Sequence, residues 1–552
     1  MKNYVLFRRC LRMLFLALSV IVLSVLVAAI EFREVTKRPS FSVESGFYED
    51  AFYLELAAPE GCSIYYTLDS SDPDKNSILY TGPIYIDDAS LNENVYSMTE
   101  GMTVQEWAVL PDFLVDKCTV VRAVAISNSV WKNQVSEVVT KSYFVGSSAE
   151  DFDGCGVVSL VTDPDNLFDT KKGIYVAGDE YTQYLATKDE SEELSWAYRP
   201  ANYRGRGLEW EREANITFWD AEGNQLLQKD IGIRIQGGWS RAYVPRSLNL
   251  FARKTYDGAD SFEYDFFGTS LELASMTLSA GGTGHITRMN DYLLSNTIDD
   301  PTYGMMSFKP YVMFLDGEYW GFYWLTEKYD ATYIQQAYGL DPSDDIVIIK
   351  ARELEEGYDE DLSLYKQMVN FFKNHDMSQE ENYQRACELI DMESFVDYYA
   401  TMVYIGRMKD WPNYNESLWR TRTVSDEPYA DGKWRWLMFD CNSYCMTSNL
   451  IEHDTLQLVL DESDIFASLW NNQTFQVNFQ MRLMEIADEC FNGDEMSQLI
   501  DNYKITMTPA LEKTWGRFFG KDSEMPTKFE SGTNSVKKFY SQRREIVNSW
   551  FD

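Results

Sequence analysis

Residues 408–420 read MKDWPNYNESLWR, a polar, turn-rich stretch between two strongly apolar segments. The stretch places Asp410 five residues before Asn415. Trp411 and Pro412 lie between them, and proline stiffens a backbone because its ring fixes φ. Loops held by a rigid scaffold carry a large share of binding and catalytic residues. We therefore predict that Asp410 and Asn415 act together in one functional loop.

A further acid follows this loop at the end of an apolar run. Residues 432–442 read GKWRWLMFDCN, which predicts a buried strand that ends at Asp440. Two carboxylates and an amide at such a place supply the hard oxygen ligands that Mg²⁺ prefers. The five-residue spacing of Asp410 and Asn415 also repeats that of the base and the metal-binding Asn in the protein-kinase catalytic loop. The pattern predicts phosphoryl transfer, with Asp410 as the base and Asn415 and Asp440 on the metal.

The segment before the loop predicts a helix. Residues 378–381, Ser-Gln-Glu-Glu, match a capping box that opens a helix. Apolar residues then recur at helical spacing and indicate a buried stripe: Phe395, Val396, Tyr399, Met402 and Val403. Gly406 is placed to end the helix. We therefore expect the loop with Asp410 to leave the end of a buried helix, which holds it firmly.

Residues 231–254, IGIRIQGGWSRAYVPRSLNLFARK, form a cationic stretch in an acidic chain. The stretch has no Asp or Glu and carries five basic residues, Arg234, Arg241, Arg246, Arg253 and Lys254. The backbone around Gly237, Gly238 and Ser240 can approach a ligand closely, as phosphate-cradling loops do. We expect an anion to bind here, with Arg246 within reach. A hairpin with solvated arginines is the alternative.

Composition limits the class of protein. The chain has 552 residues, of which 45% are apolar and 15% aromatic, so it can fill large cores. Its formal net charge is −38. Such a charge argues against nucleic-acid binding, which needs a basic face to displace counterions from phosphate. The three histidines are widely scattered, which makes a zinc site improbable.

The N-terminal region predicts export. Residues 13–30, MLFLALSVIVLSVLVAAI, are apolar except for two serines, and four basic residues precede them: Lys2, Arg8, Arg9 and Arg12. A segment of this length nearly spans a bilayer, and its basic flank stays cytoplasmic. We therefore expect a cytoplasmic tail at 1–12, a transmembrane signal anchor at 13–30 in the cell membrane, and the bulk of the chain outside. A cleaved signal peptide is the alternative, because residues 27–29 are small.

Residues 41–146 alternate between short apolar runs and turn residues, which is the pattern of a β-sandwich. The run IYYTLDSSDPDKNSILYTGPIYI, followed by TVVRAVAIS and KSYF, resembles the fibronectin-III-like module at the C-terminus of chitobiase and β-hexosaminidase enzymes. Cell-wall glycan is therefore a candidate partner. Tyr65, Tyr66 and Tyr80 could contact sugar, although strand residues of this kind more often pack in a core.

From residue 157 to residue 552 the chain resembles the spore-coat protein H (CotH) kinase-like family. The resemblance rests on several stretches in the family's order: VVSLVTDPDNLFDTKKGIYVAGDEY, the cationic stretch with its flanks, YVMFLDGEYWGFYWLTEKYD, MKDWPNYNESLWR and WRWLMFDCN. It implies an atypical protein-kinase fold that uses ATP and a divalent metal, Mg²⁺ or Mn²⁺, to phosphorylate proteins.

The resemblance also implies roles for single residues. Asp410 matches the catalytic Asp, Asn415 the amide of the loop, and Asp440 the metal-binding Asp. Arg246 stands where the family usually has a phosphate-binding Lys. Glu327 ends a hairpin that resembles the strand leading to a kinase hinge.

Three positions depart from the family pattern. Arg246 in place of Lys keeps the charge but changes its geometry and reach. Asn442, a third predicted metal residue beside Asp440 and Asn415, replaces an Asp that often follows Asp440 by two residues and so weakens the local field. Thr283-Gly284 stand where Asn-Asp is frequent. These departures leave the predicted base and the first metal ligand in place.

The sequence thus predicts a multidomain α+β protein with an N-terminal transmembrane helix, a β-sandwich module and a two-lobed, atypical kinase-like domain. Its expected function is that of an exported, membrane-anchored kinase of Ser or Thr hydroxyls in cell-surface or coat proteins. One alternative is a catalytically inactive envelope scaffold or glycan-binding surface protein. Another is a glycoside hydrolase that uses two of Glu209, Glu211 and Glu213, although their alternation more simply forms one solvated strand face.

Overall fold

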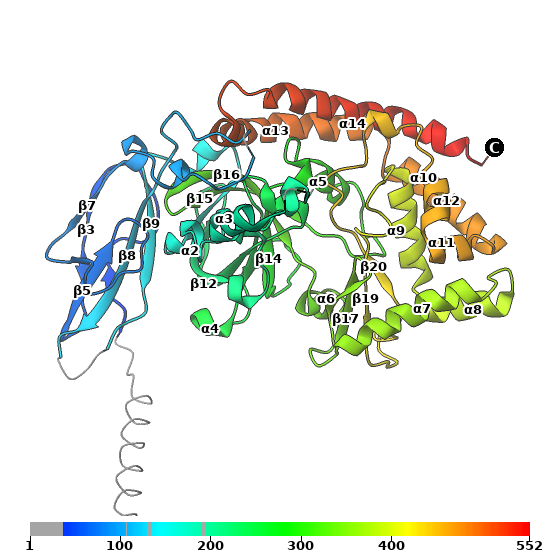
Figure 1. The fold of residues 1–552 in the computed structure, drawn as a ribbon, viewed down its shortest axis with the longest axis horizontal. Helices are drawn as coiled ribbons and strands as arrows, with labels where there is room; N and C mark the ends of the chain where they lie inside the picture. Colours follow the sequence, from blue (N-terminus) through cyan, green and yellow to red (C-terminus); the bar gives the residue numbers. More distant parts are fainter. Residues whose placement is uncertain (1–36, 106, 130–133, 190, 193, 552) are drawn as a thin grey trace, which may run out of the picture. The chain divides into compact units, whose positions relative to one another are not determined.

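The computed structural model describes residues 37–551, apart from 106, 130–133, 190 and 193, and divides them into two compact units (Figure 1). The smaller unit comprises residues 37–88 and 119–146. The larger unit comprises residues 89–118 and the chain from 147 onward. Residues 89–118, which lie inside the bounds expected for the β-sandwich, thus belong to the larger unit.

The smaller unit is built from β-strands, as the alternating sequence indicates. Its strands are β1 (Ser40–Phe41), β2 (Gly46–Tyr48), β3 (Phe52–Leu54), β4 (Leu56–Ala57), β5 (Cys62–Thr67), β6 (Ile78–Leu79), β7 (Ile84–Ile86), β8 (Thr119–Ser127) and β9 (Val139–Val145). They form a five-stranded sheet in the order β2-β9-β8-β5-β6 and the pairs β3-β7 and β1-β4. In β7, Ile84 and Ile86 enter the core while Tyr85 faces solvent, which is the period-two pattern of a half-buried strand.

A closed barrel forms the first part of the larger unit. Its strands, in spatial order, are β10 (Gly156–Val161), β11 (Arg212–Trp219), β12 (Gln225–Ile235), β13 (Leu248–Phe251), β14 (Ser275–Ser279), β16 (Glu318–Glu327) and β15 (Phe308–Leu315). Neighbouring strands are antiparallel except at the closure, where β10 pairs with β15 in parallel. On β12, Ile231, Ile233 and Ile235 point into the barrel, so the intervening Arg234 points outward.

A four-stranded sheet follows the barrel in the same unit, in the order β18-β17-β19-β20 (Figure 1). Its strands are β17 (Ile346–Lys350), β18 (Glu353–Glu356), β19 (Ser417–Thr421) and β20 (Arg435–Leu437). The helices of the larger unit are α2 (Asp165–Phe168), α3 (Gly178–Thr187), α4 (Lys254–Asp257), α5 (Asn290–Ser295), α6 (Ala331–Ala337), α7 (Leu362–Asn374), α8 (Glu380–Leu389), α9 (Met392–Tyr404), α10 (Thr455–Glu462), α11 (Asp464–Leu469), α12 (Gln473–Glu489), α13 (Gly493–Phe519) and α14 (Met525–Asn548).

The helix before the functional loop differs from the sequence prediction. The capping box at 378–381 does not form, because Gln379 is the N-cap of α8 and its side chain makes no capping bond. The expected single helix is two helices, since the backbone is extended at Ile390 and Asp391 then caps α9 by accepting from the backbone N–H of Ser394. The stripe on α9 is buried as predicted, and Gly406 adopts φ +69° just beyond its end.

The transmembrane helix in the predicted fold class is not supported. Its segment, residues 13–30, lies outside the described residues. In the part of the chain that the structure does describe, no helix combines the length and the apolar surface needed to cross a membrane. The long helices α13 and α14 carry charged residues along their exposed faces and bury the opposite face. The fold class is corrected accordingly to multidomain α+β.

Candidate active site

The loop between α9 and β19 folds tightly around Asp410. The backbone N–H groups of Tyr414 and Asn415 both donate to the Asp410 carbonyl, at 2.9 and 2.7 Å. Trp411 is buried, and its Nε1 donates to the hydroxyl of Tyr398 on α9 at 3.0 Å. The five-residue spacing therefore closes a turn, and the buried tryptophan fastens that turn to the helix.

The side chain of Asn415 bridges two carboxylates. Its Nδ2 donates to Asp410 Oδ2 at 3.0 Å and to Asp440 Oδ2 at 2.7 Å. Asp440 follows β20 with φ +59°, which turns it back toward the loop. The structure therefore brings together the predicted base and two of the three predicted metal residues, Asn415 and Asp440, although the sequence separates Asp410 from Asp440 by a strand pair.

Two cations that the sequence analysis did not consider compensate these carboxylates. Arg407 is fully buried and its Nη2 lies 2.9 Å from Asp410 Oδ1. Lys350, at the end of β17, places its Nζ 4.3 Å from the centre of the Phe439 ring, beside Asp440. Burial raises the pKa of Asp440, and the charges of Arg407 and Lys350 act in the opposite direction.

A third acid approaches this pair from behind. Asp291 on α5 accepts the backbone N–H of Cys441 through Oδ1 at 2.7 Å. Burial, and then the charge of Asp440, raise the pKa of Asp291 to about 7. The carboxyl of Asp291 is therefore close to half protonated near neutral pH, and it positions the strand end that carries Asp440.

The two departures from the family pattern that flank Asp440 contact each other. Asn442 donates through Nδ2 to Asp440 Oδ1 at 2.7 Å, and its Oδ1 accepts from the Thr283 hydroxyl at 3.0 Å. A Cβ on Gly284 would lie 2.3 Å from the Asn442 carbonyl oxygen, so only glycine fits there. Thr283-Gly284 and Asn442 therefore form a matched set, and Asn442 serves here as a hydrogen-bond support of Asp440.

The residues present fit a hard divalent cation. Oxygens of Asp410 and Asp440 converge on one amide group, and Asp440 carries a pKa raised by burial, the condition in which a carboxylate gains most from a nearby cation. Among the described residues no cluster of three or more His, Cys, Asp or Glu is arranged for a metal. A cation held here would therefore be coordinated by two carboxylates, an amide and further groups from outside the protein, such as water or phosphate oxygens.

A cationic cleft opens beside the barrel, with a volume of about 430 Å³. Basic residues from four segments line it: Arg206, Arg234, Arg241, Arg253 and Lys328. Three acidic residues also line it, Asp330, Glu355 and Glu356, so the basic residues exceed the acidic ones by two. Phe251 and Ala252 supply an apolar wall. Size, apolar wall and a few charged groups are the features of a small-molecule site.

The positive charge of the cleft is only partly compensated. Arg234 and Arg253 share the carboxylate of Glu211, at 3.5 and 2.7 Å. In the described part of the chain, Arg206, Arg241 and Lys328 have no carboxylate at ion-pair distance; each donates to a backbone carbonyl instead. Burial, and then the charge of Arg206, lower the pKa of Arg241 to about 9. The cleft is therefore prepared for an anion.

The glycine loop predicted to cradle an anion holds arginines instead. The Gly237 carbonyl accepts from Arg241 Nε at 2.7 Å and from Arg206 Nη2 at 3.3 Å. Gly238 accepts from Arg204 Nη1 at 3.3 Å. Ser240 folds back over Gly237, where a Cβ would meet its Oγ at 2.2 Å. This loop thus orients the cations of the cleft.

Two other predicted nucleotide residues are buried away from the cleft. Arg246 is fully buried, and its guanidinium donates to the carbonyls of Arg241, Tyr175 and Met102. Glu327 is 2% exposed and accepts the backbone N–H of Ser307. The residue after it, Lys328, lines the cleft. Of the predicted basic residues named for nucleotide binding, Arg234 lies in the cleft wall and Arg246 does not.

Lys350 connects the cleft with the acidic pair. Burial lowers its pKa, and the charges that act on it are those of Glu355 and Asp440, then Lys328 and Arg206. Its side chain is therefore within electrostatic range of both regions.

Glu211, the central one of the three carboxylates considered for glycoside hydrolysis, is already engaged by other residues. Glu211 is 3% exposed at its side chain and is held by Arg253 at 2.7 and 3.0 Å and by the hydroxyl of Tyr256. A Cβ on Gly232 would lie 2.4 Å from Glu211 Oε1, so the barrel leaves room for this carboxylate. The interpretation of one solvated strand face is therefore wrong for Glu211, whose role is to pair with arginines.

The missed residues left weak signals in the sequence. Arg407 lies three residues before Asp410, and Lys350 ends the apolar run IVIIK much as Asp440 ends its own strand. Charged residues at the ends of two neighbouring strands could have been read as one cluster. Arg206 and Lys328 carry no local pattern, because their position depends on contacts far away in the chain.

Comparison with known families agrees with these observations. A family model described as CotH kinase protein matches residues 233–547, which is more than half of the chain. A second model, described as Fn3 associated, matches residues 54–143, within which the smaller β-rich unit lies for the most part. No curated protein matches the chain.

Proposed function

The chain belongs to the CotH kinase protein family, and from this premise we propose that it is an exported, metal-dependent protein kinase. It transfers the γ-phosphate of ATP to Ser or Thr hydroxyls of cell-surface or coat proteins. The smaller β-rich unit is proposed to contact cell-wall glycan. Export is supported by the apolar segment 13–30 and the basic residues before it, which lie outside the described residues.

One observation carries the proposal: a bridged acidic pair and an under-compensated cationic cleft meet at one sheet, because Glu355 and Glu356 of β18 line the cleft and β18 pairs with β17, which ends at Lys350. Lys350 is influenced by Asp440 on one side and by Arg206 and Lys328 on the other. Phosphoryl transfer needs positive groups around the phosphates and a carboxylate beside the attacking hydroxyl. The arrangement supplies both.

Asp410 is suited to accept the proton of the hydroxyl. Arg407 and Asn415 hold its two oxygens in one orientation. Its side chain remains 32% exposed, so a substrate can reach it. A base in this position takes the proton as the hydroxyl oxygen attacks, and the transferred group leaves ADP.

Asp440 and Asn415 would hold Mg²⁺ or Mn²⁺, which when bound neutralises charge on the phosphates. Asn442 and Asp291 hold Asp440 from the side and from behind. In the cleft, Arg206, Arg241 and Lys328 bind the phosphates because carbonyl oxygens orient them without cancelling their charge.

The proposal is tested by incubating the purified full chain with γ-labelled ATP, Mg²⁺ or Mn²⁺ and Ser- and Thr-containing proteins. Transfer of label to hydroxyl side chains is expected. Nucleotide with metal should also raise the melting temperature, because a ligand at about a hundred times its dissociation constant stabilises the native state by roughly 2.7 kcal/mol. If no divalent metal supports either phosphate transfer or a shift in melting temperature, the kinase proposal is rejected in favour of a scaffold.

A further inference from the structure

A second pocket, of about 280 Å³, lies beside the loop that carries Asp410. The turn after β17, one face of α7, the loop itself and the start of α11 surround it. It is separate from the cationic cleft, with which it shares no lining residue. Nothing in the proposed phosphate or metal contacts uses it.

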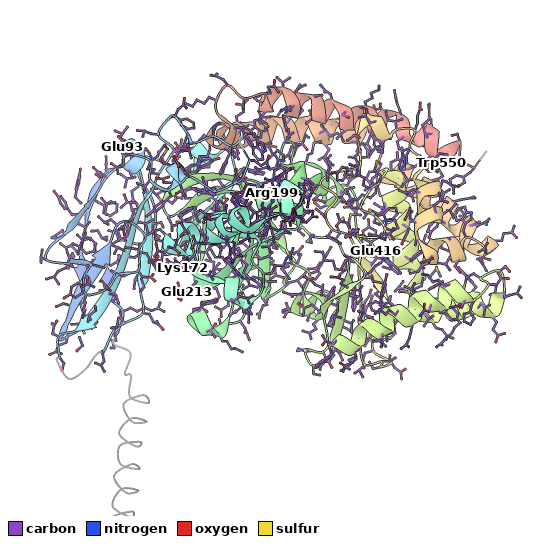
Figure 2. The ribbon with its side chains drawn as sticks, in the orientation of Figure 1. Glu93, Lys172, Arg199, Glu213, Glu416 and Trp550 are labelled. Atoms are coloured by element: carbon purple, nitrogen blue, oxygen red, sulfur yellow. The ribbon has the colours of Figure 1, made fainter. Side chains whose placement is uncertain are left out.

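The loop supplies the floor of this pocket. Pro412 and Glu416 both line it and both are buried. Glu416 Oε1 accepts from the Tyr399 hydroxyl at 2.7 Å and from Trp436 Nε1 at 2.9 Å, and Figure 2 places Glu416 beside α9, the helix that carries Tyr399. Burial raises the pKa of Glu416. The carboxylate at the floor is therefore engaged by two donors of the protein itself.

The rim of the pocket is cationic. Three basic residues line it, Arg352, Lys366 and Lys373, against the carboxylates of Glu416 and Asp464. Lys373 is paired with Asp464 at 2.9 Å. Within the described ranges, Arg352 and Lys366 have no carboxylate at ion-pair distance. The chain as a whole has a net charge of −38, so two cations without a paired carboxylate give this pocket a local charge of the opposite sign.

Arg352 is tied directly to the functional loop. Ala351 and Arg352 both have positive φ, +53° and +65°, so the turn after β17 directs the chain sharply back. The Arg352 guanidinium donates to Asn413 Oδ1, and Asn413 lies three residues after Asp410. A ligand on Arg352 would therefore be held by the same loop that holds the base.

We propose that this pocket receives an acidic side chain of the protein substrate, while a nearby Ser or Thr hydroxyl of the same substrate reaches Asp410. The inference rests on the proposed function and adds a substrate class: segments in which the acceptor has a carboxylate or a phosphate close by in sequence. Pro412 is two residues from Asp410, so their Cα atoms are at most about 7 Å apart. An extended peptide advances about 3.3 Å per residue, which sets the acidic residue about two to four positions from the acceptor.

The test measures binding of fluorescent Ser-containing peptides to the purified full chain, without nucleotide, by anisotropy. Four peptides differ at positions two to four from the acceptor and carry Glu, phosphoserine, Gln or Lys there. Salt is kept near 0.15 M, where the Debye length of about 8 Å suppresses the overall negative field of the chain. We expect the Glu or phosphoserine peptide to bind at least about fivefold more tightly than the Gln peptide; whichever of the two binds best identifies the source of the anion.

The variant Arg352→Gln with Lys366→Gln should bring the Glu and Gln peptides to nearly equal affinity. Both residues are exposed, so the variant should keep its melting temperature. Lys528→Gln with Lys538→Gln on α14 is the matched control, because it also removes two exposed positive charges elsewhere and should leave the preference intact. The proposal is overturned if neither the Glu peptide nor the phosphoserine peptide binds more tightly than the Gln peptide to the unaltered chain, and also if such a preference survives in the double variant.

Failure of this inference and failure of the proposed function give different results. Transfer of phosphate to Gln and Glu peptides at equal rates, with equal binding, retains the kinase and rejects the acidic subsite. An anion preference that depends on Arg352 and Lys366, without transfer to any peptide, retains the subsite and rejects the kinase.

Discussion

At the acidic pair every carboxylate has a compensating partner, whereas in the cationic cleft several cations have carbonyl oxygens only. Arg407 lies on Asp410, Lys350 lies beside Asp440, and Asn415 joins the two acids. Arg206 and Arg241 share the carbonyl of Gly237 instead. A carbonyl dipole orients a guanidinium but leaves its net charge in place. The acidic pair is therefore set in position before a ligand arrives, and the cleft keeps a positive field that an anion relieves.

The largest expected effect separates the two members of the acidic pair. Asp410→Asn should lose phosphoryl transfer by a factor of about 10² to 10⁴, the usual contribution of a general base, and should keep the melting shift with nucleotide and metal. Asp440→Ala should lose both, because it removes the main metal ligand. Single-turnover transfer and melting scans check this pair. If both variants lose only transfer, the division of roles between them is incorrect.

The next effect tests whether Arg246 belongs to the cleft or to the core behind it. Arg246→Ala should lower the free energy of unfolding by about 3 to 5 kcal/mol, since it leaves a cavity and three buried carbonyls without donors. Denaturant titration measures the loss. Lys at this position is the matched variant and should recover part of it. If Arg246→Ala keeps normal stability but loses much of its nucleotide affinity, Arg246 contributes to nucleotide binding and not to the core.

Replacing Asp291 tests how far its buried charge beside Asp440 destabilises the folded chain. Its pKa is raised in the folded chain to about 7, so between pH 4 and pH 7 the folded state holds a proton that the unfolded state has released. Its contribution to stability is therefore greatest below about pH 4 and declines as the pH rises to 7. Asp291→Asn keeps the acceptor for Cys441 and removes the charge.

We expect Asp291→Asn to be more stable than the unaltered chain at pH 8, by on the order of 2 to 4 kcal/mol, and equally stable at pH 4. Denaturant titrations at both pH values measure the difference. A gain of equal size at both would point to packing and not to charge. Adding Asp440→Asn should shrink the gain at pH 8, because the charge that raises the Asp291 pKa is then absent.

The smallest effect concerns one exposed cation of the cleft. Arg206→Gln should weaken ATP binding about three- to tenfold, and without nucleotide it should leave the melting temperature unchanged or slightly higher, since it relieves repulsion with Arg241. Arg544→Gln is the control, because Arg544 pairs with Asp488 on distant helices. Titration calorimetry measures the expected loss of ATP affinity, and melting scans measure the expected unchanged or higher melting temperature. Weaker binding in both variants would mean that only overall charge matters.

The residues of the acidic pair were predictable because short-range geometry fixes them. Asp410 and Asn415 belong to one turn, and Asp440 ends a strand that its apolar run identifies. The cleft was less accessible to such reasoning. Its stretch of positive charge was recognised, but Arg246 is drawn into the core by Tyr175 and Met102, which lie 71 and 144 residues earlier. Burial of this kind depends on contacts that no local pattern records.

The helix boundary failed for a different reason. Ser378 and Glu381 have the residue types of a capping box, yet the cap that matters is Asp391, where the chain leaves one helix and starts the next. Apolar residues keep the helical spacing of 3.6 residues across that break, so the spacing alone does not reveal where one helix ends and the next begins. The capping side chain marks the boundary better than the apolar stripe.

Closure of the barrel through the parallel pair β10–β15 has a consequence for synthesis of the chain on the ribosome. β10 is buried along its whole length and pairs with β11 soon after both are made, but its other partner, β15, begins roughly 150 residues later. At about 5 to 20 residues per second, one apolar edge of β10 stays unpaired for roughly ten to thirty seconds. An open edge of this kind can recruit strands of other chains. We therefore expect the yield of folded protein to depend on how well the open edge of β10 is protected while residues 156–315 are synthesised.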